Sequence, residues 1–85
     1  DVDAIALFTQ RWTHGPLAVR ALRAGKHVYS AVPMAISEEE IAAIIAAVQE
    51  TGLAYMMGET SYYNPATVLM RERIGAGALG RVFYA

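Results

Sequence analysis

Cysteine is absent from this chain of 85 residues, and charged residues are few. Lys and Arg number 7 against 8 Asp and Glu, so the formal net charge is −1. Without cysteine there is no disulfide framework and no thiolate zinc site, and a reducing cytoplasm is the expected location. A charge so close to neutral provides no basic patch for nucleic acid or for an anionic membrane. Sugars, nucleotides and other metabolites remain open as ligands.

Long hydrophobic runs are also missing, because the longest apolar run is far shorter than the ~20 residues that cross a bilayer. The first residues include Asp1 and Asp3, where a signal peptide would be basic. The acidic run at 38–40 has no histidine beside it and suits a helix start better than a metal cluster. We therefore expect neither secretion nor membrane insertion, and no metal site.

The residues that are present alternate between short apolar runs and helical patterns. Ala4 to Phe8 form a continuous apolar run, which is typical of a strand buried on both faces of a parallel sheet. Pro16 suits a first helical turn and Gly25 a left-handed helix end, so a helix is predicted between them. A second strand is predicted at His27 to Ser30.

The clearest helix is predicted to begin after Ser37. Ser37 and Glu40 have the spacing of a capping box, in which each side chain satisfies a backbone N–H at the helix start. Gly52 ends the helical pattern before another apolar strand at Leu53 to Met57.

A third unit repeats this plan. Asn64 and Pro65 suit an N-cap and a first helical residue, the helix is predicted to run through Ile74, and a last strand is predicted at Val82 to Tyr84. Each connection takes roughly twenty residues including its helix, which suits right-handed crossovers between parallel strands and is too long for hairpins. The sequence therefore predicts an α/β fold with a parallel β-sheet and crossover helices. So short a sheet would leave apolar edges, and we expect further strands or a partner to cover it.

The stretch "GAGALG" at 75–80 matches the G-x-G-x-x-G pattern of dinucleotide-binding loops. In that motif the glycines follow a strand and open a helix, so that pyrophosphate meets unpaired N–H groups at the helix N-terminus. Here the glycines close a predicted helix instead. We interpret them as a plain turn.

Ligands of an open parallel α/β sheet bind beyond the carboxyl ends of the strands. The loops "TQRWTHG" (9–15), "SAVPM" (30–34) and "GETSYYNP" (58–65) lie there. They hold most of the side chains of this chain that could take part in chemistry.

The first of these loops offers several ligand contacts. Thr9 and Gln10 could hydrogen-bond a ligand, Arg11 could pair with an anion, and Trp12 could stack on a ring. His14 suits a helix cap or a ligand contact equally well. The alternative for the whole loop is a solvated segment with one packed aromatic side chain.

The third loop carries the candidates for acid and base chemistry. Glu59 directly follows a predicted strand, so its carboxylate would stand at the mouth of the crevice. Tyr62 and Tyr63 could donate hydrogen bonds or stack. The alternatives are that Glu59 caps the sheet edge and that the tyrosines fill a domain interface.

Several short motifs appear in a fixed order along the chain: "D-A-I" at 3–5, "T-x-x-x-x-H" at 9–14, "A-G-K-H-V" at 24–28, "P-M" at 33–34, "N-P" at 64–65 and "G-A-L-G-R-V" at 77–82. In this order and spacing the chain resembles the second half of the nucleotide-binding domain of Gfo/Idh/MocA oxidoreductases, relatives of glucose-fructose oxidoreductase and inositol dehydrogenase. The resemblance spans nearly the whole chain. It implies the C-terminal portion of a Rossmann-like NAD(P)-binding domain over residues 1–85, with the glycine-rich loop before residue 1 and a sugar-binding domain after residue 85.

The resemblance implies NAD or NADP as cofactor and hydride transfer between its nicotinamide and a sugar, polyol or related hydroxyl compound. It also implies a homo-oligomer, as in many relatives. Cofactor-side roles fall on Thr9, Gln10, His14, Ala31 and Pro33, with Ala31 offering only its backbone. Trp12 joins them as a candidate stacking ring.

The chain departs from the family at the residues that manage protons. The family's Glu-Lys-Pro motif becomes Ala31, Val32 and Pro33, so the lysine that assists proton transfer is missing. Many relatives have Tyr-Arg-Phe where this chain has Ser61, Tyr62 and Tyr63.

A base would then have to come from Glu59, Tyr62 or His14, or from a second domain; we take Glu59 and Tyr62 as the catalytic candidates. The main alternative is a catalytically degenerate cofactor-binding or sensor protein of the same fold. An unrelated doubly wound module, such as a receiver domain, would need an acidic pocket at its strand ends, which this chain lacks.

Overall fold

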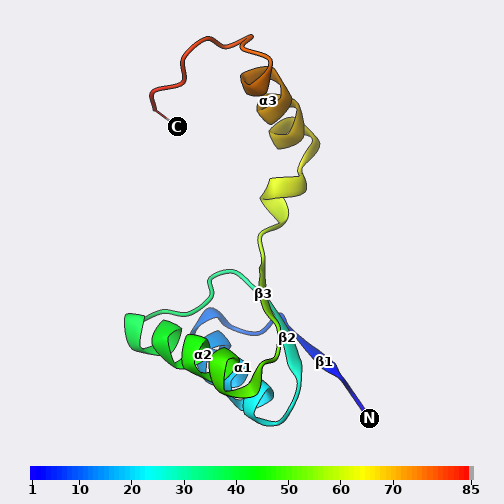
Figure 1. Ribbon diagram of the computed structural model, residues 1–85, viewed down its shortest axis with the longest axis vertical. Coiled ribbons are helices and arrows are strands. Elements are labelled where there is room, and N and C mark those ends of the chain that lie inside the picture. Colours follow the sequence, from blue (N-terminus) through cyan, green and yellow to red (C-terminus); the bar gives the residue numbers. More distant parts are fainter. Residues whose placement is uncertain (85) are drawn as a thin grey trace.

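The computed structural model describes residues 1–84, and it contains a three-stranded parallel sheet that lies beside two of its helices (Figure 1). The strands are β1 (Ala4–Leu7), β2 (His27–Ala31) and β3 (Tyr55–Gly58), in the order β1-β2-β3. Ile5 pairs with Val28, and Val28 pairs with Tyr55 on the other side. The parallel sheet and its crossovers are as predicted, and no hairpin joins the strands of residues 1–84.

Three α-helices follow the three strands: α1 (His14–Arg23), α2 (Glu38–Thr51) and α3 (Pro65–Gly75). Short 3-10 turns, η1 (Arg11–Thr13) and η2 (Thr60–Tyr63), precede α1 and α3. The predicted cap of α2 is present, because the Glu40 N–H donates to Ser37 Oγ over 3.2 Å. Gly52 ends this helix with φ of 67°, a left-handed conformation that favours glycine.

The core lies between one face of the sheet and the two helices α1 and α2. Leu7 and Val28 point from the strands to this side, and Leu22 of α1 and Ile44 of α2 meet them there; both of these helix side chains are fully buried. Alternate strand residues and helix residues spaced three or four apart thus share one apolar layer.

The other face of the sheet is open, which corrects the expectation that the first strand is buried on both faces. Phe8 lies just beyond β1 and is 72% exposed, and Met56 on the same face is 53% exposed. The reason is topological, because α1 and α2 both lie on one side (Figure 1). The third helix, α3, makes its contacts with η2 and stands away from the sheet (Figure 1).

The predicted last strand at 82–84 does not form, and this prediction was wrong for the described residues. Phe83 and Tyr84 are 91% and 88% exposed. A strand needs a neighbour to pair its N–H and C=O groups, and α3 carries the chain away from the sheet before residue 82 (Figure 1).

The glycine motif at 75–80 closes a helix, as predicted. Gly75 is the last residue of α3, and Gly77 and Gly80 take φ of 76° and 65° in the turn that follows. The Ala78 N–H donates to the Arg73 carbonyl over 3.0 Å. No helix begins after these glycines within residues 1–84, so they present no helix N-terminus to a phosphate.

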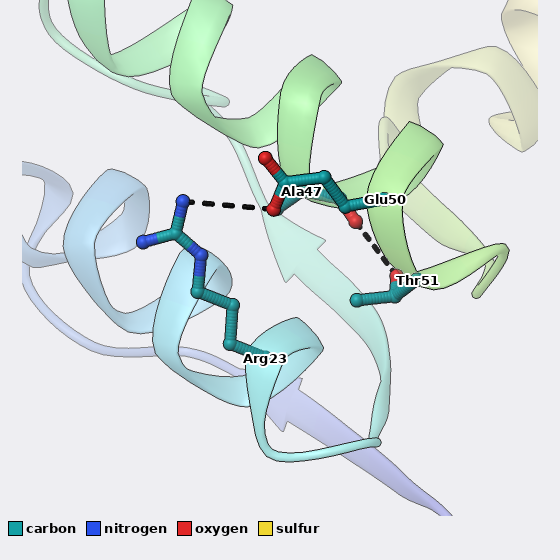
Figure 2. Close-up of polar contacts among 4 residues, drawn as sticks. All are labelled: Arg23, Ala47, Glu50 and Thr51. Carbon is teal, nitrogen blue, oxygen red and sulfur yellow. Dashed lines mark hydrogen bonds and ion pairs between the residues drawn. The ribbon is translucent and has the colours of Figure 1, made fainter.

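The carboxyl ends of α1 and α2 lie at the opposite end of the sheet from the candidate crevice, because crossover helices run antiparallel to the strands. Figure 2 shows Arg23 of α1 facing Glu50 of α2, with Nη2 and Oε2 3.7 Å apart, and Thr51 Oγ1 donating to the Ala47 carbonyl over 2.7 Å. Both charged side chains are exposed, so this ion pair contributes about 0–1 kcal/mol. This contact lies between α1 and α2 at the end of the sheet away from the candidate site.

Tyr55 gives a stability prediction. Burial raises the pKa of its phenol above the ordinary value of 10.0, and the nearby Ser30 hydroxyl offsets part of this rise. Ser30 Oγ, however, donates to the Ala31 carbonyl over 3.0 Å, and the Tyr55 hydroxyl is left buried without a hydrogen bond of good geometry. Because the folded-state pKa is the higher one, the contribution of Tyr55 ionisation to the free energy of unfolding is fully favourable below pH 10. This contribution is lost as pH rises through and beyond that value.

A Tyr55→Phe variant is therefore expected to be as stable as the wild type at pH 7, or more stable by about 1 kcal/mol, since an unsatisfied hydroxyl is removed. Above pH 10 its advantage grows. Urea unfolding at pH 7 and pH 11 measures both effects, with Tyr84→Phe at an exposed position as control. A loss of more than about 1 kcal/mol at pH 7 would contradict the absence of a hydrogen bond.

Candidate functional site

The carboxyl ends of the three strands meet at one edge of the sheet, where the candidate loops begin. Thr9 lies two residues beyond β1, Pro33 two residues beyond β2, and Glu59 directly beyond β3. Ala31 and Gly58 form the last pair between β2 and β3. All three loops therefore start from the same edge of the sheet, as their parallel strands require.

A buried imidazole joins the first two loops. His14 begins α1 and is 2% exposed. Its Nδ1 lies 2.7 Å from the Pro33 carbonyl oxygen, and its Nε2 lies 3.0 Å from the Thr9 carbonyl oxygen. We call these three residues the His14 bridge. His14 is not the cap of α1, because the N-cap position belongs to Thr13.

Two threonine hydroxyl groups form further hydrogen bonds within the first loop. Thr13 Oγ1 donates to the Gln10 carbonyl over 2.6 Å, and Thr9 Oγ1 lies 2.6 Å from Thr13 Oγ1. A hydroxyl carries one hydrogen, so Thr9 is the donor to Thr13. The Thr9 hydroxyl is left with lone pairs to accept a hydrogen bond from a ligand. Sequence reasoning missed Thr13, although its i+4 spacing from Thr9 was a usable signal.

The remaining cofactor candidates lie on the surface of this edge. Gln10 is exposed, and Trp12 in η1 is 56% exposed. Ala31 is half-buried and presents little beyond its backbone, whereas Pro33 is exposed and joined to Val32 by a cis peptide bond. Their side chains are thus available to a ligand, apart from that of Ala31.

Both catalytic candidates line one pocket next to the last loop. The pocket has a volume of about 220 Å³, and we call it the tyrosine pocket. Its lining residues are Tyr29, Met56, Met57, Gly58, Glu59, Thr60, Tyr62 and Tyr63. Thr9, His14 and Pro33 do not line it, so the candidates fall into two groups along the same sheet edge.

Glu59 has a structural role in this pocket. It is the N-cap of η2, and its Oε1 accepts a hydrogen bond from the Ser61 N–H over 2.8 Å. This backbone contact and the Ser61 hydroxyl lower the pKa of the Glu59 carboxyl below its ordinary range. The carboxylate therefore stays ionised at neutral pH, and it is a weak base for taking a proton from a substrate.

Tyr62 is held from two sides. The Arg71 guanidinium lies 4.1 Å from the centre of its ring, and Arg71 Nη1 donates to the Tyr62 carbonyl over 3.2 Å. Tyr63 packs edge-on against the same ring at 5.1 Å. Arg71 lies nine residues away on α3, and nothing in the spacing of the sequence pointed to it. It places a positive charge over the ring of this candidate.

Tyr29 is one of the residues that line the tyrosine pocket, and sequence reasoning missed it as well. Its ring lies 6.1 Å from that of Phe8, and its hydroxyl covers Gly58. A Cβ at position 58 would overlap the Tyr29 hydroxyl and ring. Gly58 is therefore required by close packing, since its backbone does not have positive φ.

Replacing Gly58 with valine is expected to lower the free energy of unfolding by about 1–3 kcal/mol, because the Tyr29 ring must move. The double variant Gly58→Val with Tyr29→Ala should regain part of this loss. Gly75→Ala is the matched control, because nothing lies within 4 Å of a Cβ there. Urea unfolding of the four proteins measures the effect, and an equal loss in the single and double variants would disprove the clash.

Two negative findings concern the described residues alone. Within residues 1–84, no group of three or more His, Cys, Asp and Glu side chains could hold a metal ion. None of the helices in that range has the length and apolar character to cross a bilayer.

Comparison with known proteins adds to this geometry. The GFO_IDH_MocA family model, described as an oxidoreductase family with an NAD-binding Rossmann fold, matches residues 1–59. The chain is 39% identical over 79 residues to 4-carboxy-2-hydroxymuconate-6-semialdehyde dehydrogenase of Sphingobium sp., covering 93% of this chain and 25% of that protein. It is 32% identical over 83 residues to scyllo-inositol 2-dehydrogenase (NAD(+)) of Bacillus subtilis, covering 98% and 24%.

The fold has close structural neighbours. A crystal structure of an NAD-binding protein from Listeria innocua superposes with a TM-score of 0.90 at 27% identity, covering 96% of this chain and 24% of that one. The chain thus spans about a quarter of the length of the relatives it matches.

Proposed function

This chain belongs to the Gfo/Idh/MocA oxidoreductase family, and we propose that its crevice forms the nicotinamide end of an NAD(P)-dependent dehydrogenase site. The observation that carries the proposal is the His14 bridge, which brings the ends of β1 and β2 together. In this proposal residues 1–85 are part of a Rossmann-like domain. The phosphate-binding loop and the substrate domain are contributed by other residues.

The residues at this edge fit one end of a dinucleotide. The Thr9 hydroxyl donates its hydrogen to Thr13 and keeps lone pairs that can accept a hydrogen bond, which suits the N–H group of a carboxamide. Gln10 offers an exposed amide, and Trp12 an exposed ring for stacking. Ala31 and Pro33 border the same place with backbone groups. NAD and NADP share this end, and either one would supply or receive the hydride.

We propose a sugar, a polyol or a related hydroxyl compound as substrate, which is supported by the similarity to scyllo-inositol 2-dehydrogenase. When such a hydroxyl compound is oxidised, a hydride leaves its carbon and a proton leaves its oxygen. Val32 stands where relatives carry the lysine that assists with this proton. In our proposal the Tyr62 hydroxyl accepts this proton while releasing its own proton to solvent, which reaches its half-exposed side chain. The Glu59 carboxylate, ionised at neutral pH, favours the departure of the proton from the substrate electrostatically.

The test is reduction of NAD⁺ and of NADP⁺ by the protein at its full natural length, against a panel of inositols, aldoses and semialdehydes. We expect absorbance at the wavelength of the reduced cofactor to rise with at least one member. Tight binding of NADH or NADPH without any turnover would refute dehydrogenase activity. That result would favour the alternative, a cofactor-binding sensor, for which the apolar Val32 at 44% exposure is the supporting observation.

Three further features stay predictions. They are a cytoplasmic location, assembly into a homo-oligomer, and small molecules rather than nucleic acids or membranes as partners.

A further inference from the structure

We propose that His14 is a positioning residue, which holds the loop after β1 at a set distance from the loop after β2 and so shapes the nicotinamide end of the crevice. This inference rests on the proposed function. His14 itself touches neither cofactor nor substrate in this proposal. Its ring is 2% exposed, and both of its nitrogens already face backbone carbonyl oxygens.

The hydrogen-bond inventory of the bridge explains why histidine is suited to this position. The Thr9 and Pro33 carbonyls are acceptors only, so a hydrogen bond to either one requires a hydrogen on the ring nitrogen that faces it. The two ring nitrogens lie on different sides of a rigid five-membered ring and can address two loops at once. A neutral imidazole donates to one carbonyl at a time, and an imidazolium donates to both.

Other side chains reproduce only part of this bridge. The amide nitrogen of asparagine can occupy roughly the place of Nδ1, which serves Pro33. The amide nitrogen of glutamine reaches roughly the place of Nε2, which serves Thr9. Phenylalanine keeps an aromatic ring of similar volume but removes the ring nitrogens that face both carbonyls. These three replacements therefore separate the two hydrogen bonds from the packing of the ring.

The bridge is connected to groups that can meet a ligand. His14 contacts the Thr9 carbonyl. The Thr9 hydroxyl begins the chain of hydrogen bonds through Thr13 to the Gln10 carbonyl. On the other loop, His14 holds Pro33, the third residue of the stretch that replaces the family's Glu-Lys-Pro motif. A shift of the imidazole would thus move an acceptor hydroxyl and the backbone of the facing loop together.

The first experiment compares His14→Asn, His14→Gln and His14→Phe in the protein at its full natural length. We expect kcat to fall about 10–100-fold in His14→Phe, because displacement of the reacting groups by about 1 Å costs up to about 100-fold. His14→Asn and His14→Gln should fall in between, and KM for the substrate should change less than kcat. Circular dichroism and thermal unfolding establish that each variant is folded at the assay temperature.

The control is His27→Gln, which changes the chain's other histidine. His27 Nδ1 accepts from the Ala54 N–H over 3.0 Å at the beginning of the strands, away from the crevice, and glutamine can also accept. Its kcat should stay at the wild-type value. A folded His14→Phe protein with wild-type kcat would overturn the proposal, because packing of the ring alone would then suffice.

A second experiment does not depend on turnover. In ¹⁵N spectra of the wild type, we expect His14 to show a ring N–H that exchanges slowly with solvent, whereas the exposed His27 shows fast exchange. Equally fast exchange at both histidines would overturn the bridge even if the enzyme is active. Slow exchange at His14 in a protein without any dehydrogenase activity would refute the proposed function and with it the catalytic consequence, but leave the bridge itself supported.

Discussion

An Ile44→Ala variant is expected to lose about 2–5 kcal/mol of unfolding free energy. Ile44 is fully buried between α2, α1 and the sheet, where it packs with Leu22 and Val28. Shortening it removes apolar area from the core and leaves a cavity that the rigid sheet cannot close. Urea unfolding followed by circular dichroism measures the loss.

The adjacent residue provides the control for this prediction. Ile45 has the same side chain on the same helix but is 49% exposed. Ile45→Ala is expected to change the free energy of unfolding by no more than about 1 kcal/mol, because most of its surface stays in water. Similar losses for the two variants would contradict the orientation of α2 over the sheet.

Tyr62→Phe is expected to lower kcat about 100-fold if the proposed dehydrogenase reaction is correct, because positioned proton transfer contributes at least about that factor. The ring and its contacts with Arg71 and Tyr63 are retained, so only the hydroxyl is lost. Steady-state kinetics with the substrate found in the panel measure kcat. Tyr63→Phe, in the same pocket, should change kcat less than about threefold.

Glu59→Gln separates charge from structure in the same assay. A glutamine oxygen can still accept from the Ser61 N–H, so the cap of η2 is preserved while the negative charge is removed. We expect about a tenfold loss in kcat, smaller than that of Tyr62→Phe. Unchanged kcat in both Tyr62→Phe and Glu59→Gln would contradict the proposed roles of these residues and indicate that residues outside the tyrosine pocket transfer the proton.

Much of the fold followed from local patterns. The boundaries of α2 were predictable from Ser37 and Gly52, because a capping side chain and a left-handed glycine are properties of a few neighbouring residues. The parallel pairing was predictable from the length of the connections. The failed prediction at 82–84 has the opposite character, since an apolar, strand-like segment becomes a strand only beside a partner.

The candidate site shows the same division. The strand ends pointed to Thr9, Pro33 and Glu59 as neighbours along one sheet edge, because parallel strands finish on the same side. The sequence offered no sign that Glu59 would cap η2, or that Arg71 would lie over Tyr62. These contacts depend on how η2 turns the chain into α3.

The order of the three strands and three helices, the boundaries of α2 and the family of this protein were determined by the sequence alone, because each depends on spacing along the chain. The role of His14 was decided only by the tertiary structure. From its position in the sequence, His14 could be a helix cap or a ligand contact. In the folded chain, two carbonyl oxygens from residues 5 and 19 positions away lie against both of its ring nitrogens. Burial and the direction of hydrogen bonds belong to the assembled fold, and they distinguish a residue that holds a site from one that touches the ligand.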